Sequence, residues 1–113
     1  MKNKVIVIGA DSFGRGDEKL GSILLSNFLR ILGEREREDL PEAIFFSNYG
    51  VRLVCEGSNK IDHLRVLQEK GVILLTCRTC LEYLGLMDRV VVGKVSSMAE
   101  FIELVSKYDV VSI

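Results

Sequence analysis

Short apolar runs alternate with longer amphipathic runs along the chain. Residues 4–9 read Lys-Val-Ile-Val-Ile-Gly, a continuous β-branched run of the kind found in strands that are buried on both faces. Four later runs are also apolar and short: residues 43–46, 72–75, 90–92 and 110–113. The pattern therefore predicts five strands.

The segments after the first two runs have helical periodicity. Asp17 is placed to cap a helix, and Gly33 is placed to end it. The apolar residues spaced three or four apart, which should form the buried face of this helix, are Leu20, Ile23, Leu24, Phe28, Ile31 and Leu32. After an irregular segment at residues 47–57, Ser58 predicts the start of a second helix. Its inward residues are Leu64, Leu67 and, less regularly, Ile61, and Lys70-Gly71 ends it.

Two more helices are expected in the second half of the chain. Residues 76–80 turn the chain into a short helix that runs through Tyr83 and Leu84. Ser97-Met-Ala-Glu100 has the spacing of a capping box and predicts a helix through Leu104 and Val105. Alternating strands and helices favour a mainly parallel sheet with helices on both faces. We therefore expect a single α/β domain over residues 1–113, a three-layer α/β/α sandwich with five strands.

Composition and charge narrow the function classes. Hydrophobic residues make up 48% of the chain and charged residues 27%, as in ordinary folded domains. The net charge is −1 and the densest charged run, residues 34–39, alternates in sign, so no nucleic-acid surface is expected. The apolar run at residues 5–10 is too short for a signal peptide, and no stretch could span a bilayer. With three cysteines, an odd number, we expect a cytoplasmic protein without a disulfide framework or membrane partner.

All three cysteines lie in segments that follow predicted strands. Ligands of open α/β sheets bind beyond the carboxyl ends of the strands. Three segments should gather there: the glycine-rich turn 11–16, the segment 48–57 with Cys55, and the turn with Cys77 and Cys80. Cysteines that only fill a core lie more often inside strands and helices. This edge is therefore the predicted functional site.

Cys77 and Cys80 form a Cys-Arg-Thr-Cys motif on a strand-to-helix turn. A helix start and the neighbouring Arg78 should both favour a thiolate, which lowers the thiol pKa and gives a nucleophile near neutral pH. A second thiol at this spacing can attack a mixed disulfide or persulfide and release the product. The alternative is a pair of buried, inert thiols.

The sequence offers two alternatives to the thiol pair, a zinc site and an anion site. Cys55, His63, Cys77 and Cys80 could supply four zinc ligands, but their spacing is not that of a zinc knuckle and His63 falls within a predicted helix. We therefore expect a surface histidine, no metal and no cofactor. Gly-Arg-Gly at residues 14–16 could hold an anion with the help of Arg15, although a turn that needs a flexible backbone is the favoured explanation of these glycines.

Four segments together resemble the DsrE/DsrF-like family, and most of all the DsrE-like domain of YedF-type sulfurtransferases. The segments lie in order along the chain and read Asp11-Ser-Phe-Gly-Arg-Gly-Asp-Glu-Lys-Leu-Gly21, Phe46-Ser-Asn-Tyr-Gly-Val-Arg-Leu-Val-Cys-Glu-Gly-Ser58, Cys77-Arg-Thr-Cys-Leu-Glu-Tyr-Leu-Gly-Leu86 and Val92-Gly-Lys-Val-Ser-Ser-Met98. The resemblance implies a DsrE-like fold and a sulfur-relay function, sometimes linked to selenium metabolism. Relatives carry persulfide on a cysteine eight residues before a glycine, which corresponds to Cys77 and Gly85 here.

The resemblance also implies roles for single residues and for partners. It ranks Cys77 first as sulfur acceptor, with Cys80 as the assisting thiol and Cys55 as a third candidate. The residues expected to support them are Arg78, Thr79, Arg15 and Asn48. Relatives commonly form trimers, hexamers or mixed assemblies, so a homo-oligomer (dimer, trimer or hexamer) is expected, together with sulfur donor and acceptor proteins.

Two departures from the family pattern leave alternatives open. YedF-type proteins typically carry a TusA-like domain before this one, and this chain begins at the first strand, so we expect a separate, TusA-like donor or a different function. Arg78 stands where the family often has glycine, and it could add charge to the thiolate or block a partner. The leading hypothesis is a sulfurtransferase-like persulfide carrier. The alternatives are a dithiol redox or sensor protein and a non-catalytic ligand-binding subunit of an oligomer.

Overall fold

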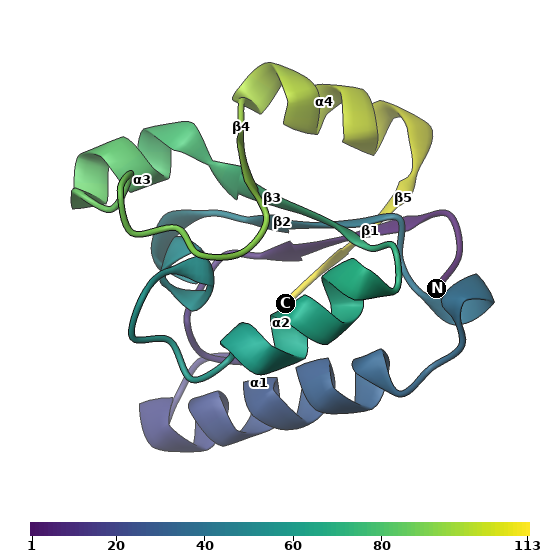
Figure 1. Ribbon diagram of the computed structural model, residues 1–113, viewed down its shortest axis with the longest axis horizontal. Coiled ribbons are helices and arrows are strands. Elements are labelled where there is room, and N and C mark those ends of the chain that lie inside the picture. Colours follow the sequence, from purple (N-terminus) through teal and green to yellow (C-terminus); the bar gives the residue numbers. More distant parts are fainter.

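Five parallel strands form the middle layer of the protein, in the order β4-β3-β2-β1-β5 (Figure 1). The computed structural model describes all residues from Met1 to Ile113. The strands are β1 (Lys4–Ile8), β2 (Ala43–Phe46), β3 (Ile73–Cys77), β4 (Lys94–Ser96) and β5 (Asp109–Ser112). The three inner strands consist mainly of apolar residues because both faces of the sheet are covered there.

Helices cover both faces of the sheet. Helices α1 (Glu18–Gly33) and α2 (Ile61–Glu69) lie on one face and α4 (Met98–Lys107) lies on the other (Figure 1). The two consecutive crossovers from β1 to β3 run in one direction across the sheet, whereas the β4-to-β5 crossover runs back. Right-handed crossovers place helices on opposite faces when the direction reverses. The predicted three-layer α/β/α sandwich with a parallel five-stranded sheet is confirmed.

Shorter elements complete the chain at the sheet ends. Helix α3 (Arg78–Leu84) continues directly from β3, and the 3₁₀ helices η1 (Arg37–Asp39) and η2 (Asn48–Val54) flank β2. The predicted irregular segment 47–57 therefore contains an ordered 3₁₀ helix. This helix packs its Val51 and Val54 side chains into the core, where both are fully buried.

The fourth strand differs from the sequence prediction. Residues 90–92 were expected to form it, but β4 begins at Lys94 and residues 90–92 form only a single antiparallel bridge, between Val90 and Cys55. The chain enters the sheet after Gly93, which has φ +74° and lies so close to Leu74 that a Cβ would stand 2.8 Å from the Leu74 Cβ. The valine run is apolar because it packs at the sheet end, where Val92 is buried.

The buried face of α1 also differs from the prediction. Of the predicted stripe only Leu32 is buried, while Leu20, Ile23, Leu24 and Ile31 are each at least 40% exposed. The face that packs inward carries Gly21, Leu25, Leu29 and Gly33. A Cβ on Gly21 would stand 1.7 Å from the Ser12 Oγ, and one on Gly33 would stand 3.3 Å from Val66. The two glycines let α1 approach its neighbours closely, which fixes the face that turns inward.

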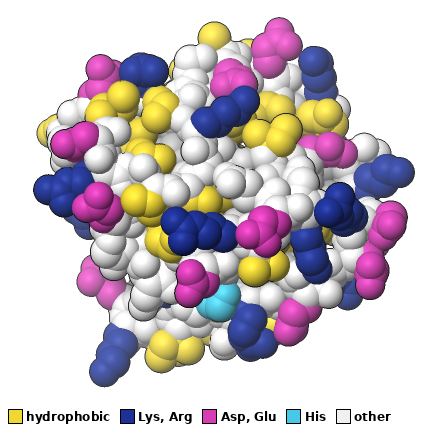
Figure 2. Space-filling model, in the orientation of Figure 1, with side chains coloured by type: hydrophobic (Ala, Val, Ile, Leu, Met, Phe, Trp, Pro, Cys, Tyr) yellow, Lys and Arg dark blue, Asp and Glu magenta, His cyan; other side chains and the backbone are white.

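Two of the three predicted side-chain caps at helix starts are present. Asp17 accepts a hydrogen bond from the Leu20 N–H at 2.8 Å, and Ser97 accepts one from the Glu100 N–H at 3.1 Å. Ser58 instead accepts from the Lys60 N–H inside the turn before α2, which therefore starts without a side-chain cap. None of the helices is long and apolar enough to cross a membrane. Figure 2 shows acidic and basic side chains interspersed over the face that it displays.

Candidate functional site

The connections after β1, β2 and β3 gather at one end of the sheet, on the left of Figure 1. Because the strands are parallel, this end collects their carboxyl termini, as the sequence predicted. Cys77 is the last residue of β3, and Cys80 lies in the first turn of α3. The two thiols therefore meet where the sheet ends.

Cys77 is buried at this junction. Its side chain is 4% exposed, and its Sγ caps α3 by accepting a hydrogen bond from the Cys80 N–H at 3.4 Å. Burial raises the pKa of the Cys77 thiol, and a hydrogen bond with the Cys80 side chain raises it further; together they outweigh the backbone N–H groups of Cys80 and Thr79, which lower it. The predicted lowering of this pKa is therefore wrong, because burial was not visible in the motif.

Cys80 is the more accessible thiol. Its side chain is half-buried, and its Sγ accepts a hydrogen bond from the Asn48 N–H at 3.2 Å. Asn48 has φ +51°, and its own side chain accepts the Tyr49 N–H at 2.9 Å, which stabilises the left-handed turn. A surface cavity of about 410 Å³ opens beside Cys80 and is lined by Asn48, Tyr49, Thr79, Cys80, Tyr83 and Leu84. A ligand or a partner's side chain can therefore reach Cys80 from solvent.

Gly50 holds η2 against β1 and so positions Asn48. A Cβ on Gly50 would stand 2.1 Å from the Ile8 carbonyl oxygen and 3.3 Å from the Ala10 nitrogen. The Gly50 N–H also donates to the Ser47 carbonyl at 2.8 Å. Only glycine permits this approach, because the contacting atoms are backbone and cannot rotate away.

Cys55 belongs to a different cavity. It is 3% exposed, and its thiol donates a hydrogen bond to the Val51 carbonyl at 3.2 Å. Burial raises the pKa of Cys55, and the Glu56 carboxylate adds to the increase. The cavity that it lines has a volume of about 480 Å³ and shares no lining residue with the Cys80 cavity. Cys55 is thus near the same end of the sheet but is not brought together with the thiol pair.

The family of the chain follows from its sequence. Residues 21–112 match the DsrE/DsrF-like family. The chain belongs to this family. Two solved structures share the DsrE-like fold: the YchN protein from E. coli, with a TM-score of 0.72 over 100% of both chains at 20% identity, and MTH1491 from Methanobacterium thermoautotrophicum, a protein of unknown function, with a TM-score of 0.69 over 97% of both chains at 18% identity. No curated protein matches the sequence. The closer resemblance to YedF-type proteins stays a prediction.

The structure separates the supporting residues of this DsrE-like protein into two groups. Asn48 and Thr79 lie in the wall of the Cys80 cavity, as expected of supporting residues. The side chains of Arg78 and Arg15 are exposed and make no hydrogen bond or ion pair. Arg78 is also absent from the interactions that shift the Cys77 pKa, so its proximity in sequence does not place its charge on that thiol. No three side chains among the histidine, cysteines and acids are grouped closely enough to hold a metal ion.

Three features of the site were missed by sequence reasoning. Tyr83, 79% exposed, and Tyr49, 47% exposed, form aromatic walls beside Cys80. Tyr83 follows Cys80 by three positions on α3, a spacing that predicts a shared helix face and could have identified it. Arg52 lies over the Tyr49 ring at 3.9 Å and pairs with Asp11 at 3.4 Å, which links the first loop to η2. Lys60 is almost completely buried, and nothing in its sequence context indicates this.

Proposed function

We propose that this DsrE-like protein is a sulfur carrier that holds sulfur as a persulfide on Cys80 and passes it to a partner protein. The observation that carries the proposal is the unequal accessibility of two adjacent thiols. Cys80 lines an open cavity, whereas Cys77 is buried beside it. The family resemblance ranks Cys77 first as acceptor, and we reverse this order in our proposal because Cys80 is the more accessible thiol.

Loading of Cys80 transfers one sulfur atom without net oxidation. The Cys80 thiolate attacks the outer sulfur of a donor persulfide, the donor's S–S bond breaks, and the donor leaves as a thiolate while Cys80 becomes a persulfide. The Asn48 N–H, which already points at the Cys80 Sγ, supports the negative charge on sulfur. In the return step an acceptor thiolate attacks the outer sulfur of the Cys80 persulfide and regenerates the Cys80 thiolate.

Cys77 supports this cycle as a buried, protonated thiol beside Cys80. Because burial raises its pKa, it stays protonated at neutral pH and can donate its S–H to the neighbouring sulfur. A neutral Cys77 also reacts slowly with the Cys80 persulfide, since the thiolate is the nucleophile. The pair thereby protects the persulfide from internal attack.

The proposal also includes a partner protein and an assembly of copies of the chain, which two exposed surfaces would suit. Tyr49 and Tyr83 form an aromatic rim around Cys80 that suits the apolar surface around a partner's thiol, such as that of a TusA-like donor. The exposed apolar side chains of α1, among them Leu20, Ile23 and Leu24, suit a contact between copies of the chain. Free thiols and a persulfide persist best in a reducing compartment, so the proposal includes a cytoplasmic location.

Dithiol redox chemistry is the second candidate. The hydrogen bond from the Cys80 N–H to the Cys77 Sγ, at 3.4 Å, keeps the two residues adjacent. Adjacent thiols can close a disulfide and pass two electrons to an oxidant. This function requires Cys77 to act as a thiolate, which its raised pKa disfavours at neutral pH.

Loading with a small persulfide donor, followed by peptide mass spectrometry, tests the proposal. We expect the mass of one extra sulfur atom on Cys80 in the wild type, in Cys77→Ser and in Cys55→Ser, and none in Cys80→Ser. Circular dichroism confirms that each variant is folded. Sulfur that remains on Cys77 or Cys55 while Cys80 is unmodified would overturn the assignment.

A further inference from the structure

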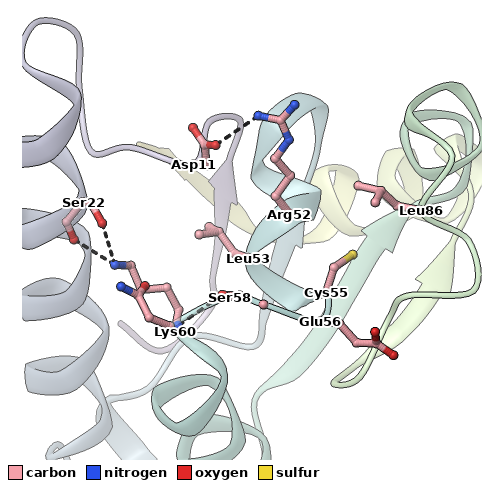
Figure 3. Close-up of a pocket in the computed structure, with 11 residues that line it drawn as sticks. Asp11, Ser22, Arg52, Leu53, Cys55, Glu56, Ser58, Lys60 and Leu86 are labelled. Atoms are coloured by element: carbon pink, nitrogen blue, oxygen red, sulfur yellow. Dashed lines mark hydrogen bonds and ion pairs between the residues drawn. The ribbon is translucent and has the colours of Figure 1, made fainter.

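A second cavity lies beside the one that holds Cys80. Its volume is about 480 Å³, within the range of small-molecule sites, and η2, the turn before α2 and the first half of α1 surround it (Figure 3). Its lining is mostly polar and includes Asp11, Ser22, Arg52, Glu56 and Lys60. The sulfur-carrier proposal uses none of these side chains.

Lys60 is a buried cation without a counter-charge. It is 2% exposed, and its Nζ donates to the Ser22 carbonyl at 3.0 Å and to the Ser22 Oγ at 2.9 Å (Figure 3). Both acceptors are neutral, and no carboxylate lies within ion-pair distance of Lys60. Burial lowers the pKa of Lys60, as expected when a charge leaves water without compensation.

The other charges that line the cavity are already balanced. Arg52 pairs with Asp11 at 3.4 Å, and Glu56 pairs with Arg89 at 3.4 Å. The ammonium of Lys60 is therefore the one unbalanced charge in the wall. A negatively charged ligand would balance the ammonium of Lys60.

Lys70, at the other end of α2, is a lysine whose charge is balanced by its surroundings, in contrast to Lys60. Its Nζ donates to the Gly33 carbonyl at 2.7 Å and to the Arg35 carbonyl at 3.0 Å, at the C-terminal end of α1, where the helix dipole is negative. Lys60 instead donates to the carbonyl of the fifth residue of α1, far from the negative C-terminal end of that helix, so no helix end balances its charge. Helix α2 also lacks the side-chain cap that α1, α3 and α4 have. The buried ammonium of Lys60 therefore lacks the balancing negative charge that Lys70 has.

We propose that this cavity binds a small molecule through an oxyanion group, with Lys60 as the principal charged contact. The cavity is larger than a bare oxyanion requires, so Asn59 remains available to bind polar groups on the rest of the ligand. The phosphate or carboxylate of a metabolite and the free ion share this chemistry. The proposal goes beyond sulfur transfer and does not depend on Cys80.

An NMR titration with inorganic phosphate and with glycerol phosphate tests the proposal. Sodium chloride at equal ionic strength is the control for screening. We expect saturable shifts of the backbone amides of residues 57–61 with both anions, and tighter binding of glycerol phosphate if the oxyanion belongs to a larger ligand. Equal affinity for the two would identify the free ion as the ligand. The absence of saturable shifts with either anion would overturn the proposal.

Two lysine variants locate the binding. Lys60→Met should weaken the binding of phosphate at least tenfold. Lys70→Met is the control, because Lys70 also ties α2 to α1, and it should leave the affinity for phosphate unchanged. Lys60→Met should keep or raise the melting temperature of the free protein, because it removes an unbalanced buried charge. If it fails to fold, Lys60→Gln removes the charge and keeps a donor for Ser22. Undiminished binding in the folded variant would contradict the role of Lys60, and Cys80→Ser should bind phosphate like the wild type.

Discussion

Gly50→Ala is the substitution that links the fold most directly to the reactive thiol. The added Cβ would stand 2.1 Å from the Ile8 carbonyl oxygen, and ordinary contact begins at 3.4 Å, so η2 must move outward by about 1.3 Å. The Asn48 N–H lies 3.2 Å from the Cys80 Sγ and would lose its hydrogen bond after such a shift. Overpacking of this kind costs about 1–3 kcal/mol of unfolding free energy.

Urea unfolding and the rate of Cys80 alkylation measure the two consequences. Gly9→Ala is the matched control, because its Cβ would meet only the Ser47 Oγ at 3.7 Å, an ordinary contact. We expect the control to keep the wild-type stability within about 0.5 kcal/mol. We expect Gly50→Ala to lose stability and to change the rate of Cys80 alkylation at a fixed pH, because the Asn48 N–H no longer contacts the Cys80 Sγ. Equal behaviour of the two variants would refute the role assigned to the contact between η2 and β1.

Three further predictions concern the two faces of α1 and the titration of Cys77. Leu25 is fully buried, so Leu25→Ala should lower the free energy of unfolding by about 2–5 kcal/mol in urea titrations. Leu24 is 40% exposed, so Leu24→Asp should keep the circular dichroism spectrum and reduce the assembly size in analytical ultracentrifugation; loss of the fold would show that the face of α1 is assigned wrongly. The folded-state pKa of Cys77 is raised, so its protonated thiol contributes stability that is complete below the unfolded-state pKa of about 8.5 and is lost as pH rises through the folded value. The unfolding free energy of the wild type should therefore fall relative to that of Cys77→Ala as the pH rises above about 8.5, and a parallel pH dependence would contradict the burial argument.

Elements whose role depends on local sequence were predictable. Residues 4–8 and 43–46 form inner strands, and their apolar runs predicted them almost to the residue. The turn from β3 into α3 was equally visible, because a strand-like run leads directly into the motif that starts at Cys77. These features need no knowledge of distant neighbours.

Elements whose role depends on distant neighbours could not be predicted from the sequence. Helix α1 is apolar on more than one side, so periodicity alone could not choose its buried face, and the close approaches of Gly21 to Ser12 and of Gly33 to Val66 decide it. Residues 90–92 are more apolar than β4, but an edge strand such as β4 can be short and polar. The accessibility of the thiols likewise depends on η2 packing across the sheet end.

The same limit applies to the charges around the site. Arg78 is next to Cys77 in sequence, yet it contributes nothing to the shift of that pKa, whereas burial, a non-local property, dominates it. Asn48, from another connection, supplies the hydrogen bond to Cys80. Sequence proximity therefore identified the two thiols but not their environment.

A single-turnover transfer experiment tests the central claim most directly. The protein is loaded with isotopically labelled persulfide, freed of donor and mixed with a small thiol acceptor, and the label is followed by mass spectrometry. Our account predicts that the label leaves Cys80 as an acceptor persulfide and that Cys77 and Cys80 both return as free thiols. Release of the label as free sulfide with formation of a disulfide between Cys77 and Cys80 would contradict sulfur transfer and establish dithiol redox chemistry instead.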